Sequence, residues 1–284
     1  MTELHYENSA KTLSVSHRIA LSHNMPESHF HSTYEIYYLM SGQREFFIKD
    51  RTILAPEGHI VIIAPNILHR TMNARKPKHE RFIVNIHESM MTAAYGERPE
   101  ILRPLLEREY LVFACSPQDR LFIDELVRNI LRELEQRPAG FEMYVHTLVL
   151  QMLIVCCRHI RDRQLEPMTS PSPMHDRISE IVRYMNRHYM DDLSLQQMAE
   201  KFYISPYYLS RLFKEATGFT FVEYLNHVRV KEAKKLLESS SLKVNQISRK
   251  VGFGSVTHFG RVFKQISGRN PSRTGGKPDR SPSL

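Results

Sequence analysis

The sequence predicts an α+β multidomain protein, with an N-terminal β-barrel and helical hairpin followed by an all-α domain with two helix-turn-helix units. Three observations predict this architecture. Short β-rich segments separated by turn residues fill residues 13–87, a pattern typical of antiparallel barrels and sandwiches. Two amphipathic helical patterns follow between residues 119 and 161. An internal repeat at an offset of 50 residues near the C-terminus marks a duplicated structural unit.

The N-terminal strands are expected where β-branched and aromatic side chains cluster, at residues 34–40, 45–48, 59–64 and 81–86. Ser41-Gly42 lies between the first two segments and is a hairpin signal, and Asp50-Arg51 marks a second turn. Residues 90–115 show no regular pattern. We therefore expect several short strands joined by tight turns.

Two helices are expected next. Residues 119–135 carry a single apolar stripe, residues 141–161 are apolar over a wider face, and Pro138-Ala139-Gly140 separates them. They should form an antiparallel hairpin. A hairpin with more apolar surface than one barrel flank requires would pair with its copy in a second chain, which favours a homodimer. The alternative is that it packs only on its own barrel.

The charge of the chain is distributed unevenly. The net charge is +8, and residues 175–284 hold 19 Lys and Arg against 10 Asp and Glu, whereas residues 1–174 hold 20 against 21. The change occurs at the Pro- and Ser-rich stretch 164–174, which we interpret as a linker. A basic domain beside a nearly neutral one indicates a polyanionic partner for the basic half, and nucleic acid is the usual one.

The basic half contains the repeat. Ser205–Gly218 (SPYYLSRLFKEATG) aligns with Ser255–Gly268 (SVTHFGRVFKQISG), and each copy has a helix-start Ser, an apolar stripe, basic residues and a terminal Gly. Shorter helical patterns precede them at residues 195–202 and 244–251. Two short helices joined by a tight turn, twice over, predict a pair of helix-turn-helix units.

A single long helix over residues 222–238 should join the two units. Its length of about 25 Å would let two recognition helices enter successive major-groove turns, which are roughly 34 Å apart. The turn of the second unit has Gly252, which suits a left-handed backbone, whereas the first unit has the costlier Tyr203.

The remaining composition favours a soluble, cytoplasmic protein without a cofactor. Cys115, Cys156 and Cys157 form neither a disulfide framework nor a CxxC motif. The N-terminus lacks an apolar signal core, and the longest apolar run, Leu148–Cys157, is about half a membrane span.

The C-terminal pattern resembles the DNA-binding domain of the AraC/XylS transcription regulators over residues 178–272. The residues that carry this resemblance are Leu195, Ala199, Ser205-Pro206, Tyr208–Lys214, Gly218, Arg229, Ala233, Leu236-Leu237, Val251–Phe253, Phe259, Arg261, Phe263-Lys264, Gly268 and Pro271-Ser272. The chain departs from the family at Arg273–Gly276, where the usual closing helix should be short and frayed.

The resemblance implies recognition helices at residues 205–216 and 255–266. The residues that would face the groove are Pro206, Tyr207, Ser210 and Arg211 in the first helix and Val256, Thr257, Gly260 and Arg261 in the second. Arg can hydrogen-bond guanine edges bidentately, while Lys214 and Lys264 would contact phosphate. Because Val256 and Gly260 offer little hydrogen bonding, the second helix should recognise sequence less sharply.

A second resemblance lies in the N-terminal half. His29-x-His31-x3-Glu35, followed by Pro65-x3-His69, is similar to the two motifs of the cupin barrels, in whose metal-binding members these four positions hold one divalent ion. Three interpretations stay open: a metal site, hydrogen bonds to a polar ligand, or side chains that satisfy one another.

The predicted domains are a cupin-like sensing domain (1–115), a dimerisation hairpin (116–163), the linker (164–174), the DNA-binding domain (175–274) and a disordered tail (275–284). The resemblance implies a non-enzymatic transcription regulator, an activator by family habit, that binds double-stranded promoter DNA and a small polar effector such as a sugar, with RNA polymerase as a further partner and no membrane contact. One alternative is a metal-dependent cupin enzyme with an accessory DNA-binding domain, and another is a regulator whose barrel only dimerises.

Overall fold

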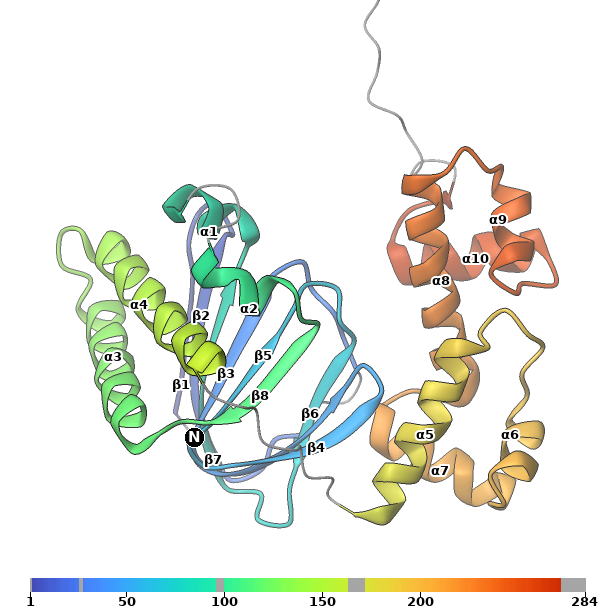
Figure 1. The fold of residues 1–284 in the computed structure, drawn as a ribbon, viewed down its shortest axis with the longest axis horizontal. Coiled ribbons are helices and arrows are strands. Elements are labelled where there is room, and N and C mark those ends of the chain that lie inside the picture. Colours follow the sequence, from blue (N-terminus) through green and yellow to red (C-terminus); the bar gives the residue numbers. More distant parts are fainter. Residues whose placement is uncertain (1, 26–27, 96–99, 163–171, 272–284) are drawn as a thin grey trace, which may run out of the picture. The chain divides into compact units, whose positions relative to one another are not determined.

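A computed structural model describes residues 2–25, 28–95, 100–162 and 172–271 (Figure 1). The chain divides into two compact units, Met1–Pro173 and Met174–Leu284, and we describe each by itself. The expected tail at 275–284 and most of the expected linker lie outside the described residues. The last two linker positions differ from expectation, because a helix already begins at Pro173.

The first unit is an antiparallel β-structure with helices on one side. Its strands are β1 (Thr2–Glu7), β2 (Leu13–Ala20), β3 (Tyr34–Ile48), β4 (Arg51–Pro56), β5 (His59–Ile63), β6 (His69–Asn73), β7 (His79–Ile86) and β8 (Tyr110–Ala114). Its helices are α1 (Glu88–Tyr95), η1 (Glu100–Leu102), α2 (Arg103–Leu106), α3 (Pro117–Gln136) and α4 (Phe141–Asp162). The main sheet has the order β1-β2-β7-β3-β5-β8, while β4 and β6 pair with β3.

The long strand β3 organises this unit, and here the expected hairpin at Ser41-Gly42 is wrong. The strand continues through a bulge between Leu39 and Ser41. Gly42 has φ +86°, and a Cβ there would lie 2.3 Å from the Lys78 carbonyl oxygen, so only glycine fits. As far as Gly42, β3 pairs with β5 and β7, and from Gln43 onward it pairs with β4 and β6. One strand therefore passes from one sheet layer into the other.

Other boundaries also differ from expectation. Residues 90–115, which show no pattern in the sequence, contain the short helices and the edge strand β8, and β1 precedes the expected strand region. The expected turn at Asp50-Arg51 lies one residue earlier, where Lys49 has φ +55° and β4 begins at Arg51.

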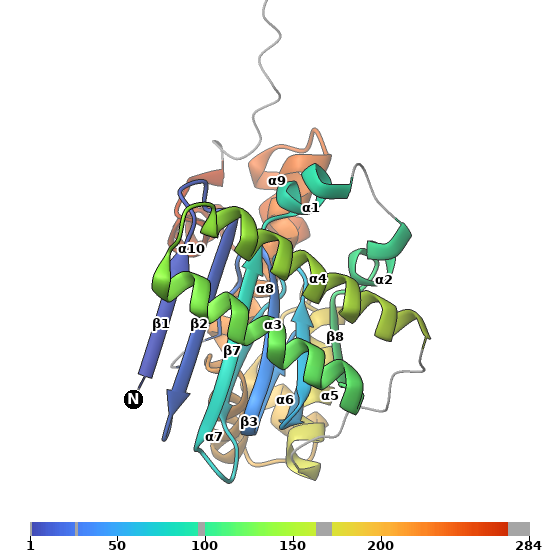
Figure 2. The same cartoon turned by 90° about the vertical axis from the view of Figure 1, so that its left-hand side faces the viewer.

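Alternate residues of the strands build two separate cores. On β3, Tyr37 and Leu39 point into the barrel, where they pack with Phe46 and residues of β4, β5 and β7. Ile36 and Tyr38 point to the other face, where they pack against α3 and α4. Figure 2 shows both helices lying across this face of the main sheet. The barrel interior is therefore closed on one side by a sheet that the helices support from outside.

The two long helices correspond closely to the predicted hairpin. Their apolar stripes are buried against the sheet of their own chain, so the surplus apolar face expected for dimerisation is largely used within one subunit. Leu121 and Met143 are the most exposed apolar side chains of the hairpin, at 71% and 75%. Helix α4 is long and apolar enough to span a membrane by length and composition, yet its stripe belongs to this core.

The second unit contains six described helices. They are α5 (Pro173–Arg187), α6 (Leu195–Lys201), α7 (Pro206–Thr217), α8 (Phe221–Ser239), α9 (Val244–Lys250) and α10 (Val256–Ser267). Ser194 and Gln197 form a capping box at the start of α6. Ser205 and Ser255 cap α7 and α10, which both end at a glycine in the left-handed conformation. The repeat in the sequence is thus a repeat of the same cap–helix–cap geometry.

Arg229, on α8, joins the two helix-turn-helix units. Its Nε donates to the Tyr189 carbonyl oxygen and its Nη2 to that of Asp191, both at 2.8 Å. The guanidinium carbon lies 5.6 Å from the ring centre of Phe253. The side chain is buried, so one planar fork connects the loop after α5 to the turn of the second unit.

The two turns provide a stability test. Tyr203 has φ +54° and is 92% exposed, so its left-handed backbone strain is not offset by packing. Tyr203→Gly should raise the free energy of unfolding by about 1 kcal/mol. Denaturant unfolding of the full chain, followed by far-ultraviolet circular dichroism, measures the change.

The matched control is Gly252→Ala at the equivalent turn. A Cβ there would lie 2.7 Å from the Met190 carbonyl oxygen, so this change should lower the free energy of unfolding by more than about 1 kcal/mol. Equal effects of the two substitutions would contradict the assignment of strain to Tyr203.

Candidate functional site

The residues predicted to face DNA lie on the solvent-accessible sides of α7 and α10. In α7, Pro206, Tyr207, Ser210, Arg211 and Lys214 are all exposed. The opposite face, which includes Leu209 and Phe213, is buried as expected for packing residues. The helix N-cap at Ser205 directs the first turn, with its orphan amide groups and Tyr207, toward solvent. This face can therefore meet a groove without any rearrangement of the unit.

Arg211 is supported by a neighbour on its own helix. Its guanidinium carbon lies 5.7 Å from the ring centre of Tyr208, a geometry that favours cation–π attraction. A supported guanidinium loses less side-chain freedom when it binds a base edge or phosphate.

The second helix presents a smaller surface. Val256, Thr257, Arg261 and Lys264 are exposed, and Gly260 is half-buried. A Cβ built on Gly260 meets no atom within 4 Å, so nothing within the described part of the protein requires a glycine there. Glycine inside a helix costs roughly 0.5–1 kcal/mol relative to alanine. An outside surface that approaches the helix closely would explain the residue.

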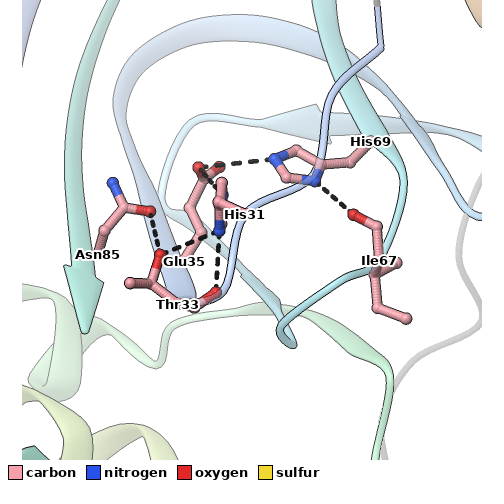
Figure 3. Close-up of polar contacts among 6 residues, drawn as sticks. All are labelled: His31, Thr33, Glu35, Ile67, His69 and Asn85. Atoms are coloured by element: carbon pink, nitrogen blue, oxygen red, sulfur yellow. Dashed lines mark hydrogen bonds and ion pairs between the residues drawn. The ribbon is translucent and has the colours of Figure 1, made fainter. Parts of the chain in front are cut away.

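A polar cluster at one end of the barrel unites the four residues of the N-terminal motifs. One ligand atom from each of His29, His31, Glu35 and His69 lies within 4.8 Å of the other three. A backbone bridge between His29 and His69 positions two of the imidazoles, with both N–H to O distances at 2.9 Å. The bend of β3 brings β6 over the start of the same strand, so His69 reaches Glu35. Figure 3 shows His31 and His69 converging on the Glu35 carboxylate.

Backbone carbonyl groups fix the orientation of two imidazoles. Nδ1 of His69 lies 2.8 Å from the Ile67 carbonyl oxygen, and Nδ1 of His31 lies 2.9 Å from that of Thr33 (Figure 3). Carbonyl oxygens only accept, so both Nδ1 atoms donate a proton and both Nε2 atoms face the carboxylate. Nε2 lies 3.2 Å from Glu35 Oε2 in His31 and 3.6 Å in His69.

Burial and charge set the protonation of the cluster. Burial alone would raise the pKa of Glu35, but the hydrogen bond with His31 and the nearby charges of His31 and His69 outweigh it and hold that pKa well below its usual range. Burial alone would lower the pKa of His69, but Glu35 raises it. Burial and the neighbouring His69 lower the pKa of His29 to about 4. A carboxylate, a protonatable imidazole and a neutral imidazole therefore share one small space.

The donor set fits a divalent metal ion. His69 Nε2 is too far from Glu35 for a hydrogen bond, and the buried Nδ1 of His29 likewise has no hydrogen-bond partner among the described residues. Carbonyl-oriented imidazoles are the usual outer-shell arrangement of histidine ligands, and mixed imidazole and carboxylate donors suit zinc, iron, nickel or manganese. These four residues would hold such an ion, which would supply a positive charge for a polar ligand.

Other polar groups inside the barrel are absent from the sequence prediction. Arg44 and Tyr37 are completely buried, and Arg81 shares their interior. Their position along the strands is the signal that could have found them. Arg44 is two residues from Phe46 and Arg81 is two residues from Ile83, so each shares a face with a residue of the barrel core. Charged residues are almost never fully buried unless they are paired.

The coupling of Glu35 to its imidazoles predicts a pH-dependent stability in the presence of a chelator. The lowered pKa of Glu35 makes its contribution available above its ordinary value of 4.5, and the raised pKa of His69 makes the pair strongest below the ordinary histidine value of 6.5. Between pH 4.5 and pH 6.5, the free energy of unfolding of wild type should exceed that of Glu35→Gln by on the order of 1–3 kcal/mol.

This difference should shrink as the pH rises through the folded pKa of His69. Denaturant unfolding of both proteins between pH 5 and pH 8.5 measures it. A difference that is constant or grows with pH would show that the carboxylate does not interact with a protonated imidazole.

Gly260 supplies a second prediction. Gly260→Ala should raise the melting temperature of the free protein, because the helix gains about 1 kcal/mol and the Cβ enters open space. If DNA approaches α10 closely, the same substitution should weaken DNA binding severalfold. Ala216→Gly is a buried control that should lower stability instead. Equal DNA affinity of Gly260→Ala and wild type would exclude a close approach at this position.

Comparisons with known proteins match both halves of the chain to families. The family described as the AraC-like ligand binding domain matches residues 13–151, and the family described as a helix-turn-helix domain matches residues 198–276. The first match contains most of the barrel with the histidine cluster, all of α3 and the first half of α4. The second contains α7, α8 and α10 with all predicted DNA-facing residues.

Three relatives show how far the similarity extends. The uncharacterised HTH-type regulator YijO of Escherichia coli is 31% identical over 150 residues, which are 53% of this chain and 51% of that one. The regulatory protein PocR of Salmonella typhimurium is 37% identical over 95 residues, 34% of this chain and 31% of its own. These two matches thus span about half and a third of the relatives' lengths. The transcriptional activator RhaS of Escherichia fergusonii is 24% identical over 95% of this chain and 96% of its own. Two domain matches in this order, and relatives of one regulatory class, establish that the chain belongs to the AraC family of transcriptional regulators.

Proposed function

We propose that this protein binds promoter DNA sequence-specifically and that each chain contacts two adjacent major-groove segments. The observation that supports this proposal most directly is the pair of matching helices α7 and α10, each with an exposed arginine and lysine and a buried aromatic face. Helix α8 joins the two units and has 19 residues, or about 28 Å. This length is close to the roughly 34 Å repeat of the groove.

The two helices should contribute unequally to recognition. On α7, Arg211 is accompanied by the exposed Tyr207 and Ser210, which can hydrogen-bond to bases or phosphates. On α10, Arg261 is accompanied by Val256 and Gly260, whose side chains cannot hydrogen-bond. Lys214 and Lys264 would neutralise phosphates without reading the sequence. The excess positive charge of this half favours DNA contact at every site and makes affinity depend strongly on salt.

The barrel is the proposed sensor. A small polar effector, such as a sugar or another metabolite, would bind inside it and contact His29, His31, Glu35 and His69. Binding would change how the barrel and the hairpin present the DNA-binding unit, and so shift the population of DNA-competent molecules. The cluster is also the observation that favours a second candidate, a metal-dependent enzyme with a DNA-binding domain.

The remaining assignments follow from the same proposal. RhaS is named a transcriptional activator, which supports activation here, with RNA polymerase as a partner in the cytoplasm. A homodimer is supported by the exposed Leu121 and Met143 on the hairpin. Sedimentation of the full chain would test this pairing.

Arginine substitutions test the DNA proposal and its asymmetry. Arg211→Ala should weaken binding to a selected site by about 1–3 kcal/mol and relax specificity at one base pair. Arg261→Ala should cost less and change specificity less. Binding of full-length variants to sites selected from random DNA measures both effects, with the salt dependence recorded for each.

A suitable control is Arg120→Ala, which removes an arginine from the first unit, where Arg120 pairs with Glu57. It should leave DNA affinity unchanged. Equal losses of affinity and specificity for Arg211→Ala and Arg261→Ala would contradict the asymmetry. Selection of no defined site would contradict sequence-specific binding itself.

A further inference from the structure

The barrel interior contains a second polar site, formed by arginines. Arg44 lies on β3 beyond the bulge and Arg81 lies on β7 opposite Leu39. Both side chains occupy inward positions by strand parity. Tyr37 lies between them and Glu35 on the same face of the sheet, two residues from Glu35 along β3. The interior therefore has a carboxylate with imidazoles at one end and guanidinium groups at the other.

Arg44 is completely buried and only partly hydrogen-bonded. Its Nη1 donates to Asn73 Oδ1 at 2.8 Å. Its Nε and Nη2 have no hydrogen-bond partner anywhere in the described part of the chain. These two nitrogens form one edge of the planar guanidinium, the edge that matches the two oxygens of a carboxylate.

Arg81 has a similar deficit. Its Nε is buried without a hydrogen-bond partner among the described residues, and its guanidinium carbon lies 5.8 Å from the ring centre of Tyr37. The buried Tyr37 hydroxyl lies near Arg44, and each group shifts the pKa of the other, but the hydroxyl makes no hydrogen bond of normal geometry within the described ranges. Four buried donor atoms on the three side chains Arg44, Arg81 and Tyr37 thus lack a hydrogen-bond acceptor of normal geometry among the described residues.

The carboxylates near the two arginines, Glu45 near Arg44 and Glu35 and Glu3 near Arg81, act on them only through charge at longer range. Neither Arg44 nor Arg81 forms an ion pair with any carboxylate that the structure describes. The nearby Arg18 is already paired with Glu3. The charges of Arg44 and Arg81 also act on His23 and His79. Burial lowers the pKa of His79 to about 4, so its imidazole is neutral near pH 7. Buried guanidinium groups are rare unless an anion accompanies them.

We propose that the effector of this protein is a small organic acid whose carboxylate binds the free edge of Arg44, with Arg81 and the Tyr37 hydroxyl as further donors. The two arginines would neutralise one carboxylate, which would itself satisfy the buried donors. The remainder of the molecule would extend toward Glu35 and the histidines, which recognise hydroxyl or amino groups. This inference rests on the proposed sensing role of the barrel and narrows its ligand from polar to anionic.

Ligand-dependent stability of the full-length protein tests the inference. The probes are acetate, succinate, gluconate and citrate, with inorganic phosphate and chloride at equal ionic strength for comparison. At least one carboxylate should raise the melting temperature saturably, and calorimetry should give its Kd. Arg44→Lys and Arg81→Lys keep the charge but lose the planar edge, so each should weaken that Kd at least tenfold.

Two further variants distinguish ligand binding from a structural role. Arg120→Lys alters an exposed guanidinium on the outside of the same unit, bonded to Glu57, and should leave the Kd unchanged. Arg44→Met should be at least as stable as wild type in chloride and should lose the carboxylate-dependent increase. A lower melting temperature of Arg44→Met in every buffer would assign Arg44 to the fold and overturn the inference.

The other outcomes are equally decisive. No response to any carboxylate, an unchanged Kd in both lysine variants, or a response to phosphate alone would each overturn the assignment. DNA binding is measured separately in chloride. A protein that selects a DNA site but binds no carboxylate refutes this inference alone, and one that binds carboxylate but selects no site refutes the DNA proposal alone.

Discussion

The fork of Arg229 holds together the part of the molecule on which its function depends. Helix α8 connects the two helix-turn-helix units, but a single helix leaves each unit free to rotate about its ends. Arg229 removes that freedom with two hydrogen bonds to the carbonyls that follow α5 and a contact with the ring of Phe253 in the second turn. Gly252 is required beside it, because a Cβ there would lie 2.8 Å from the Tyr189 carbonyl oxygen and 3.0 Å from Arg229 Nε. The spacing of α7 and α10 is therefore fixed within the second unit.

The barrel depends on a comparable constraint in β3. Because the strand bends at Gly42 instead of reversing, its two halves belong to opposite walls of one interior. The first half carries Glu35 and Tyr37, and the second carries Arg44 and pairs with the strand that carries His69. A single strand thus brings a carboxylate, a hydroxyl and a guanidinium into one enclosed space. Their burial from water makes each interaction strong and makes each missing partner costly.

Local signals in the sequence predict the DNA-binding half well and the barrel less well. Helix caps, apolar stripes and terminal glycines act within a few residues, so the ends of α7 and α10 follow from Ser205, Ser255, Gly218 and Gly268. A glycine with positive φ serves a bulge as readily as a turn, which explains why Ser41-Gly42 suggested a hairpin. The convergence of His69 on Glu35 depends on the pairing of β6 with β3, a long-range contact that spacing alone does not determine. The inward positions of Arg44 and Arg81 follow only from the register of β3 and β7, which places both side chains in the barrel interior.

The central claim is that α7 and α10 are held at a fixed spacing. Footprinting of the purified full-length protein on a selected site tests this claim most directly. Each subunit should protect two groove segments about one helical turn apart on the same face of the duplex. Arg229→Ala, which releases the fork, should lose protection of one segment while keeping the other. Protection of a single segment by the wild-type subunit, or an unchanged footprint in Arg229→Ala, would contradict this account.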